Sequence, residues 1–317
     1  MTVTALNIDA VRQAAHRIAP WAHRTPVLRS KFFDQRTGAR VAFKCENFQR
    51  AGAFKFRGAA NAVLSLTDEE ARRGVVTHSS GNHAQALALA ASLRGAPATI
   101  VMPAGSAAVK RAAVIGYGAT VIDCAPTLAA REETAAEAVR RTGGVFVHPY
   151  DDARIIAGQG TAALELLEQA PDLDVIFTPV GGGGLLCGTA ITASAVSPRA
   201  RVIAGEPTGA DDAQRSLAAG EIVPSVNPQT VADGLRTSLG ELNFPIIQKL
   251  VAEILTVDDT QTLAAMRLVW ERMKIIIEPS SAVPVAALLA NAERFAGLNI
   301  GIILSGGNVD LAALKWD

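Results

Sequence analysis

A single lysine, Lys55, stands between Phe54 and Phe56 where the sequence turns from strand-like to helix-like. Burial among aromatic side chains removes water from an ammonium group, which lowers its pKa and makes the neutral amine accessible near neutral pH. Such an amine forms Schiff bases with carbonyl compounds, so this segment predicts covalent catalysis through Lys55. The alternative interpretation is a lysine at a helix start whose ammonium group reaches solvent beside Arg57.

Four consecutive glycines, Gly181 to Gly184, follow the apolar run 175–180 and precede an alanine-rich stretch. Backbone N–H groups of such a loop converge on an anion at a helix N-terminus, so we expect phosphate binding here. A merely tight turn needs one or two glycines, and four cost backbone entropy. A rival interpretation is a loose dinucleotide-binding fingerprint, in which Glu206 at the end of the next strand binds a ribose.

Two further polar segments follow predicted strands. The run from His78 to His83 presents hydroxyls, an amide and free N–H groups at a helix start, which predicts a site for a substrate carboxylate. Ser79 or Ser80 as an ordinary helix cap is the alternative. Ser305, followed by Gly306, could hydrogen-bond a ring nitrogen without imposing charge, and a plain strand-to-helix turn is the alternative there.

These residues need a scaffold that brings strand ends together. Short β-branched runs alternate with Ala-rich amphipathic stretches along the chain, which predicts an α/β fold with parallel sheets covered by helices. We expect a small mobile domain at 74–150 and a large domain formed by 1–73 and 151–317. The nine predicted strands are Val41–Cys45, Val75–His78, Ala98–Met102, Thr120–Cys124, Val145–His148, Val175–Pro179, Val202–Glu206, Ile254–Val257 and Ile300–Leu304. Helices are expected between them, including His83–Leu93, Ser106–Ile115 and Leu128–Arg141.

Composition limits the range of partners. The 317 residues include 30 basic and 30 acidic side chains, so no net charge attracts nucleic acid, and a small neutral or zwitterionic ligand fits better. Three widely spaced cysteines argue against a disulfide framework or a zinc site and favour a cytoplasmic location. No window approaches the roughly 18 apolar residues that span a bilayer, so we expect no membrane association.

The ordered motifs point to a family. The chain resembles fold-type II pyridoxal-phosphate enzymes, which are tryptophan synthase β-like, and within them the serine racemase and serine/threonine dehydratase group, including the 3-hydroxyaspartate ammonia-lyases. The resemblance covers about 26–310 and implies two open, mostly parallel sheets covered by helices. The segments that carry it are 47–58 with its Phe-Lys pair, Ser79–His83, Ala157–Thr161, Gly181–Gly184, Glu278–Ser280 and Ser305–Asn308.

The resemblance also implies roles for individual residues. Lys55 would carry pyridoxal 5'-phosphate and remove the substrate α-proton, and Ser80 would act as the base on the opposite face in racemases of the group. The implied cofactor-binding residues are Phe54, Lys55, Asn82, Gly181, Gly182, Gly183, Gly184, Leu185 and Ser305, with Asn82 at the ring hydroxyl and Ser305 at the ring nitrogen. The implied substrate-binding residues are Ser79, Ser80, Asn82, His83 and Arg131.

A divalent-cation site is implied as well. The spacing of Glu206, the Ala210 carbonyl and Asp212 is similar to the cation site of the serine racemase branch, and oxygen ligands suit Mg²⁺, Ca²⁺ or Mn²⁺. Carboxylates at a solvated helix start are the alternative interpretation. Arg131 resembles a position that can approach the substrate's β-substituent, where a guanidinium would suit a second carboxylate. An exposed helix arginine is the alternative.

The sequence departs from the family pattern in two places. Ala51-Gly52-Ala53 lacks the hydroxyls of the usual Thr-Gly-Ser, which weakens the case for a nucleotide effector near Arg50. Tyr150-Asp151-Asp152 replaces the asparagine segment of animal racemases and favours a lyase. We therefore expect an ammonia-lyase that acts on 3-hydroxyaspartate, L-serine or L-threonine and forms a homodimer. A racemase is the nearest alternative. An NAD(P)-dependent oxidoreductase and a silent ligand-binding module are the more distant ones.

Overall fold

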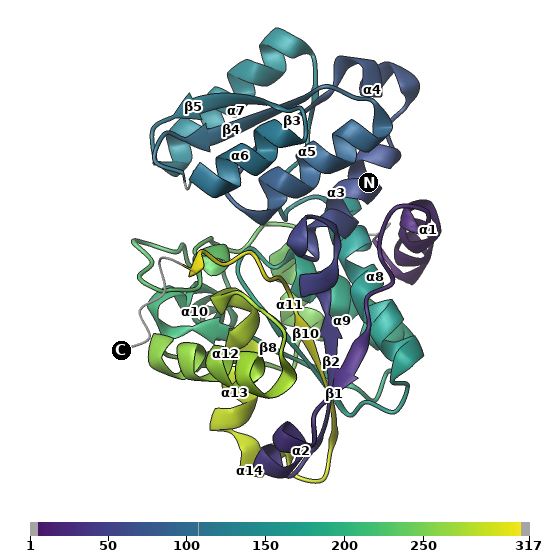
Figure 1. The fold of residues 1–317 in the computed structure, drawn as a ribbon, viewed down its shortest axis with the longest axis vertical. Coiled ribbons are helices and arrows are strands. Elements are labelled where there is room, and N and C mark those ends of the chain that lie inside the picture. Colours follow the sequence, from purple (N-terminus) through teal and green to yellow (C-terminus); the bar gives the residue numbers. More distant parts are fainter. Residues whose placement is uncertain (1–5, 107, 312–317) are drawn as a thin grey trace.

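The computed structural model describes residues 6–106 and 108–311 (Figure 1). The strands are β1 (Val27–Arg29), β2 (Arg40–Cys45), β3 (Val75–His78), β4 (Ala98–Pro103), β5 (Thr120–Cys124), β6 (Val145–Phe146), β7 (Val175–Pro179), β8 (Arg201–Pro207), β9 (Glu253–Val257) and β10 (Asn299–Leu304). The helices are α1 (Ile8–Ile18), α2 (Lys31–Thr37), α3 (Lys55–Leu64), α4 (Asp68–Arg73), α5 (Asn82–Arg94), α6 (Ala108–Gly116), α7 (Leu128–Thr142), α8 (Ala153–Gln169), α9 (Gly184–Val196), α10 (Asp212–Ala219), α11 (Asn243–Leu250), α12 (Asp259–Met273), α13 (Pro279–Ala290) and α14 (Ala292–Phe295). Short 3-10 turns are η2 (Glu46–Phe48), η3 (Arg50–Gly52), η4 (Thr208–Ala210) and η5 (Asp233–Leu235).

Two sheets organise these elements. The large sheet has six strands in the order β1-β2-β10-β7-β8-β9, and the small sheet has four in the order β5-β4-β3-β6. Every neighbouring pair is parallel except β1 with β2. The expected α/β class with two mostly parallel sheets is confirmed. The small sheet and its helices form one end of the molecule, and the large sheet forms the other (Figure 1).

Both faces of each sheet are buried, which explains the continuous apolar runs that predicted the strands. In β7, Ile176 packs into one core cluster while Val175 and Phe177 pack into the cluster on the other face. In β3, Val75 and Val76 likewise enter different clusters. Successive side chains point to opposite faces of a strand, so only a strand covered by helices on both sides can bury all of them.

The structure differs from the local predictions in three of the elements. The strand expected over Val145–His148 ends at Phe146, because Nδ1 of His148 accepts hydrogen bonds from the backbone N–H groups of Tyr150 and Asp151 and turns the chain. The three-residue strand β1 was not predicted. It is an antiparallel edge strand of only three residues, which is too short to show a pattern of its own. The expected helix Ser106–Ile115 begins at Ala108, and residue 107 lies outside the described residues.

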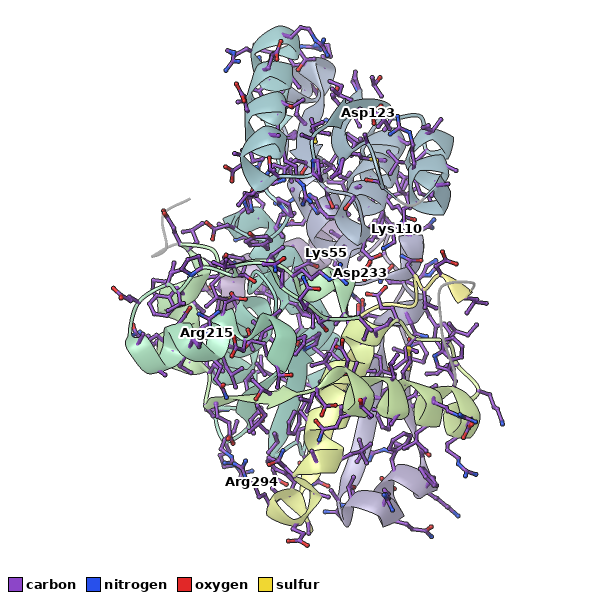
Figure 2. All side chains as sticks on the ribbon, turned by 90° about the vertical axis from the view of Figure 1, so that its left-hand side faces the viewer. Lys55, Lys110, Asp123, Arg215, Asp233 and Arg294 are labelled. Atoms are coloured by element: carbon purple, nitrogen blue, oxygen red, sulfur yellow. The ribbon has the colours of Figure 1, made fainter. Side chains whose placement is uncertain are left out.

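The strand ends meet between the two sheets. The parallel strands β2, β10 and β7 lead at their C-terminal ends into the segments that carry Lys55, Ser305 and the glycine loop, and β3 leads into Ser79. Helix α3 packs against α5 on one side and α8 on the other. Lys55 lies where the two ends of the molecule meet, close to Lys110 and Asp233 (Figure 2). Within the described residues, no helix is both long and apolar enough to cross a bilayer.

Candidate active site

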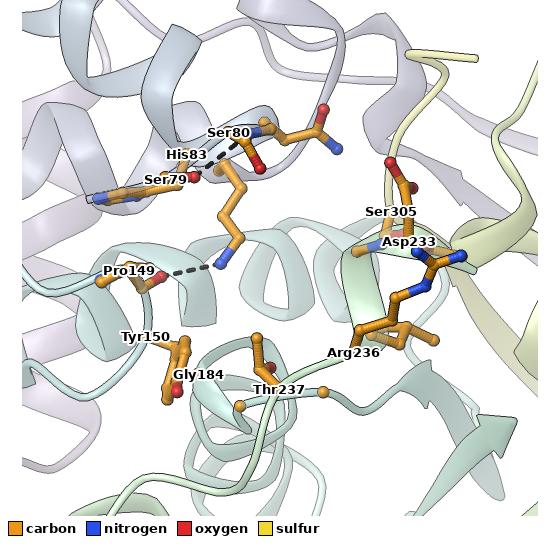
Figure 3. Close-up of a pocket in the computed structure, with 18 of the residues that line it drawn as sticks. Ser79, Ser80, His83, Pro149, Tyr150, Gly184, Asp233, Arg236, Thr237 and Ser305 are labelled. Atoms are coloured by element: carbon orange, nitrogen blue, oxygen red, sulfur yellow. Dashed lines mark hydrogen bonds between the residues drawn. The ribbon is translucent and has the colours of Figure 1, made fainter. Parts of the chain in front are cut away.

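A cavity of about 440 Å³ lies between the two sheets (Figure 3). Every residue that the sequence assigned to a cofactor or an amino-acid substrate lines it. These residues are Phe54, Lys55, Ser79, Ser80, Asn82, His83, Arg131, Gly181, Gly182, Gly183, Gly184, Leu185 and Ser305. Open α/β sheets bind ligands at the C-terminal ends of their strands, and here the ends of both sheets border one cavity.

Lys55 is the first residue of α3, and it lines this cavity. Its Nζ donates a hydrogen bond to the Pro149 carbonyl at 2.8 Å and lies 5.3 Å from the centre of the Phe54 ring. Burial of the amine lowers the pKa of Lys55 to about 8, although the Glu278 carboxylate acts in the opposite direction. A substantial neutral fraction of the amine therefore exists near neutral pH, as nucleophilic chemistry requires.

The glycine loop joins β7 to the N-terminus of α9. Gly183 caps the helix with a φ of +97°, which side chains rarely permit. A Cβ atom at Gly182 would lie 2.3 Å from the ring of Tyr150, and one at Gly183 would lie 3.0 Å from Cβ of Asn243. The loop itself therefore places no side chain between its backbone N–H groups and the cavity, as a phosphate group requires, while the Tyr150 ring packs against Gly182.

The segment from Ser79 to His83 forms the opposite wall. Oγ of Ser79 accepts a hydrogen bond from the backbone N–H of Gly81 at 3.3 Å, and α5 begins at Asn82. His83 is buried, and burial together with the positive charge of Lys55 holds its pKa well below the usual value. The ring is therefore neutral at physiological pH.

Ser305 closes the wall at the end of β10. It is buried, and its Oγ lies 3.1 Å from Oγ of Ser281. The Ser281 hydroxyl in turn donates to the Gly306 carbonyl at 2.7 Å and so fixes the backbone beside Ser305. A neutral hydroxyl thus lines the cavity at the end of β10.

Arg131 reaches the cavity from α7, although its position on a polar helix could equally have been exposed. Its Nε is buried and has no hydrogen-bond partner among the described residues. A buried guanidinium donor without a partner can bind an anionic group of a ligand.

Several lining residues were not assigned from the sequence, and four of them make contacts that bear on the site. Tyr150 covers the glycine loop, Glu278 lies beside Asn82, and Lys110 pairs with Asp233 across the cavity. Glu278 belongs to a motif that supported the family resemblance, so its segment carried a signal. Lys110 and Asp233 are ordinary charged residues in the sequence, and only the fold places them together.

The predicted metal ligands lie elsewhere, at the end of β8 and the start of α10. The Glu206 carboxylate accepts backbone hydrogen bonds from Ala213 at 2.8 Å and Gln214 at 2.9 Å, and burial raises its pKa to about 8. Oδ2 of Asp212 is buried without a partner among the described residues, and burial raises the pKa of Asp212 to about 6. Within residues 6–106 and 108–311, no group of three or more His, Cys, Asp and Glu side chains is arranged to bind a metal.

The same geometry weakens the dinucleotide interpretation. Both carboxylate oxygens of Glu206 accept hydrogen bonds from the N-terminus of α10, and Glu206 does not line the cavity next to the glycine loop. A ribose-binding acid would need to face the ligand. The Lys55 amine, in contrast, lies in the same cavity as the loop.

Comparison with known proteins decides between these interpretations. The family model described as pyridoxal-phosphate dependent enzyme matches residues 18–306. The chain belongs to this family. Members similar to it include a "beta-hydroxyaspartate dehydratase" of Paracoccus denitrificans, 51% identical over 96% of this chain and 97% of the relative. A serine racemase of Arabidopsis thaliana is 50% identical over 99% of this chain and 96% of the relative.

Solved structures of the family share the whole fold. The crystal structure of serine racemase from Dictyostelium discoideum superposes with a TM-score of 0.93, at 48% identity, and covers 96% of this chain and 99% of that one. The family therefore accounts for Lys55, the glycine loop and Ser305 in one cavity, and it makes the chain a pyridoxal-phosphate dependent enzyme.

Proposed function

We propose that the protein is an ammonia-lyase that converts 3-hydroxyaspartate to oxaloacetate and ammonia by elimination of the β-hydroxyl group. L-Serine and L-threonine are its secondary substrates, giving pyruvate and 2-oxobutanoate. The observation that carries the proposal is the single cavity in which the Lys55 amine faces the glycine loop, with Arg131 on the wall.

The cofactor would occupy the floor of the cavity. Lys55 would carry it covalently, Gly181 to Gly184 with Leu185 would bind its phosphate, and Ser305 would meet the ring nitrogen. Phe54 would lie beside the ring, and Asn82 would bind the ring hydroxyl. When bound, pyridoxal phosphate withdraws electrons from the substrate Cα. A neutral serine at the ring nitrogen moderates this withdrawal and favours elimination over transamination.

The side chains of the cavity would bind the substrate and transfer its protons. The N–H groups and hydroxyls of the segment 79–83 would bind the substrate α-carboxylate at the start of α5. Lys55 Nζ, released when the substrate amine takes its place, would remove the α-proton. The β-hydroxyl would accept a proton, which the Lys55 ammonium can return, and would leave as water. Hydrolysis of the resulting enamine would then give the 2-oxo acid and ammonia.

Arg131 supports a dicarboxylic substrate. Its unpartnered Nε lies in the wall of the cavity, and a second carboxylate would satisfy the guanidinium. The Paracoccus relative, whose name refers to hydroxyaspartate, agrees with this choice. Serine and threonine have no second carboxylate and would leave Arg131 unpaired.

A serine racemase is the second candidate. Ser80 lines the cavity as Lys55 does, and a proton delivered from Ser80 to the face opposite the lysine would invert the α-carbon. The similarity to the serine racemase of Arabidopsis thaliana supports this activity as a side reaction.

Further features belong to the same proposal. Glu206, the Ala210 carbonyl and Asp212 would bind Mg²⁺, or Ca²⁺ or Mn²⁺, because Asp212 offers a buried oxygen without a partner. The segment 74–150 would move as a small domain against 1–73 and 151–317, and the molecule would be a homodimer in the cytoplasm. Three unpaired thiols, at Cys45, Cys124 and Cys187, support a reducing compartment.

A panel assay tests the function. Purified protein loaded with pyridoxal phosphate is given each 3-hydroxyaspartate isomer, L-serine and L-threonine, and 2-oxo acid, ammonia and the D-amino acid are measured. We expect the fastest 2-oxo acid release from one hydroxyaspartate isomer, and no release by Lys55→Ala. D-serine as the main product from L-serine would favour the racemase, and undiminished turnover by Lys55→Ala would overturn both.

A further inference from the structure

Glu278 occupies the capping position before α13 but does not cap this helix. Its side chain makes no hydrogen bond to the first turn, where Pro279 has no N–H to donate. The residue is nevertheless only 4% exposed and lines the cavity. A buried carboxylate that leaves a helix N-terminus unused must gain its hydrogen bonds elsewhere.

These hydrogen bonds cross from one sheet layer to the other. Nδ2 of Asn82, at the start of α5, donates to both carboxylate oxygens of Glu278, at 2.9 and 3.1 Å. The backbone N–H of Asn308 donates to Oε2 at 3.1 Å. Nδ2 of Asn308 then donates to Oδ1 of Asn82 at 2.9 Å and to the Ala51 carbonyl at 2.7 Å.

This network determines the orientation of the Asn82 amide. A carboxylate only accepts hydrogen bonds, so Nδ2 of Asn82 must face Glu278, while Oδ1 faces the donor on Asn308. A flipped amide would set Oδ1 against the carboxylate and Nδ2 against a donor. Asn82 lines the cavity, so the orientation of its amide decides which of its polar atoms a ligand there would meet.

All direct hydrogen-bond donors to Glu278 in the described structure are neutral, and within it no cation forms a salt bridge with this carboxylate. Burial raises the pKa of Glu278 to about 7, while the bond from Asn82 acts in the opposite direction. The hydrogen bonds of this carboxylate are therefore made to neutral groups, and two of the three come from the Asn82 amide.

We propose that Glu278 is a positioning residue, which sets the Asn82 amide so that it donates to the cofactor ring hydroxyl and joins α5 to the end of β10. The inference rests on the proposed cofactor-binding role of Asn82. Glu278 does not react itself. It removes the alternative amide orientation, in which Asn82 would present an acceptor to the cavity.

Cofactor binding to the apoprotein tests this role. The dissociation constant of pyridoxal phosphate is measured by equilibrium dialysis, and the visible spectrum is recorded against pH, for wild type, Glu278→Gln, Asn82→Ala and the double variant. A glutamine side chain offers Asn82 both a donor and an acceptor, so the amide is no longer fixed. We expect about a tenfold weaker affinity for Glu278→Gln, equivalent to one lost hydrogen bond, and a shifted spectral titration.

The double-mutant cycle separates positioning from general stability. In the Asn82→Ala background, Glu278→Gln should change the affinity less than twofold, because nothing remains to be oriented. The matched control is Asp259→Asn, because Asp259 also accepts only from neutral groups, Thr230 Oγ1 and the Val231 N–H, but does not line the cavity. It should leave both readouts unchanged.

An equal effect of Glu278→Gln in both backgrounds, or no effect in either, overturns the inference while leaving the proposed function intact. A wild-type protein without a visible band overturns the proposed function instead. If Glu278→Gln does not fold, Asn308→Ala replaces it, because this variant removes the donor to Oδ1 of Asn82 and keeps the carboxylate. Asn308→Ala should weaken the affinity for pyridoxal phosphate severalfold when residue 82 is asparagine, and should leave it unchanged when residue 82 is alanine. An effect only in the protein with alanine at position 82 counts against the inference.

Discussion

Nζ of Lys110 lies 2.5 Å from Oδ2 of Asp233, and this ion pair joins α6 to η5 across the cavity (Figure 2). The two side chains are 20% and 48% exposed. An ion pair in such contact with solvent contributes about 0–1 kcal/mol, which is small enough to allow the proposed motion of the segment 74–150 to break it.

Lys110→Met should therefore weaken substrate binding rather than abolish catalysis. Loss of at most about 1 kcal/mol predicts a KM up to about fivefold higher, and the wild-type KM should rise with salt while that of the variant does not. Steady-state kinetics at two ionic strengths measure this. Arg294→Met is the matched control, because Arg294 pairs with Glu253 far from the cavity. Equal salt dependence in wild type and Lys110→Met would refute a role for the pair in closure.

Arg131→Ala should change substrate preference. A lost charge-assisted pair predicts a decrease of about 10- to 100-fold in kcat/KM for 3-hydroxyaspartate and less than threefold for serine. Arg131→Lys keeps the charge without the bidentate geometry, so its kcat/KM for 3-hydroxyaspartate should lie between those of the wild type and Arg131→Ala. Arg140→Ala, on the same helix but exposed, is the control. An unchanged ratio between the two substrates would remove Arg131 from substrate recognition.

Gly182→Ala should destabilise the glycine loop. The added Cβ would lie 2.3 Å from the Tyr150 ring, and overpacking of this kind costs about 1–3 kcal/mol. We expect a lower melting temperature and a weaker affinity for pyridoxal phosphate, both partly restored by adding Tyr150→Ser. Gly116→Ala, where no atom lies within 4 Å of the new Cβ, is the comparison and should be nearly neutral. If Gly182→Ala binds pyridoxal phosphate with wild-type affinity, the Tyr150 ring can move aside and the expected overpacking does not occur.

The lowered pKa of Lys55 predicts how the apoprotein takes up its cofactor. The neutral amine is the reactive form. The rate at which the apoprotein binds pyridoxal phosphate covalently should therefore rise about tenfold per pH unit up to a midpoint near 8 and level off above it. Stopped-flow absorbance of apoprotein mixed with pyridoxal phosphate measures the profile. Ordinary surface lysines would give a rate that still rises towards pH 10, and such a profile would show that the amine is not enclosed.

A divalent cation should stabilise the protein through Asp212. At about 100 times its dissociation constant, Mg²⁺ would add about 2.7 kcal/mol and raise the melting temperature by several degrees, and a chelator would reverse the effect. Asp212→Asn should abolish the shift. Asp211→Asn should keep it, because Asp211 pairs with Arg215 at the surface. A shift of equal size in both variants would place the cation elsewhere.

Much of the fold was predictable because its signals are local. Strands buried on both faces, such as β7 and β10, must be continuously apolar, and a loop that receives a phosphate at close range must lack side chains. Strand β1, with only three residues, is too short to carry such a signal and was missed. The His148 ring, which ends β6 early through two backbone hydrogen bonds, was equally invisible.

The sequence by itself determined which chemical groups the protein possesses: a lysine between two aromatic side chains, a glycine loop and a neutral serine, each in a segment that follows a predictable strand. Only the tertiary structure decided which distant groups meet. Asn82 and Glu278 are 196 positions apart, and Lys110 and Asp233 are 123 apart. Neither pair has a local signature, because a hydrogen bond between distant segments depends on how the sheets pack and not on the conformational preference of either segment. The amide orientation of Asn82 and the contact across the cavity follow from that packing.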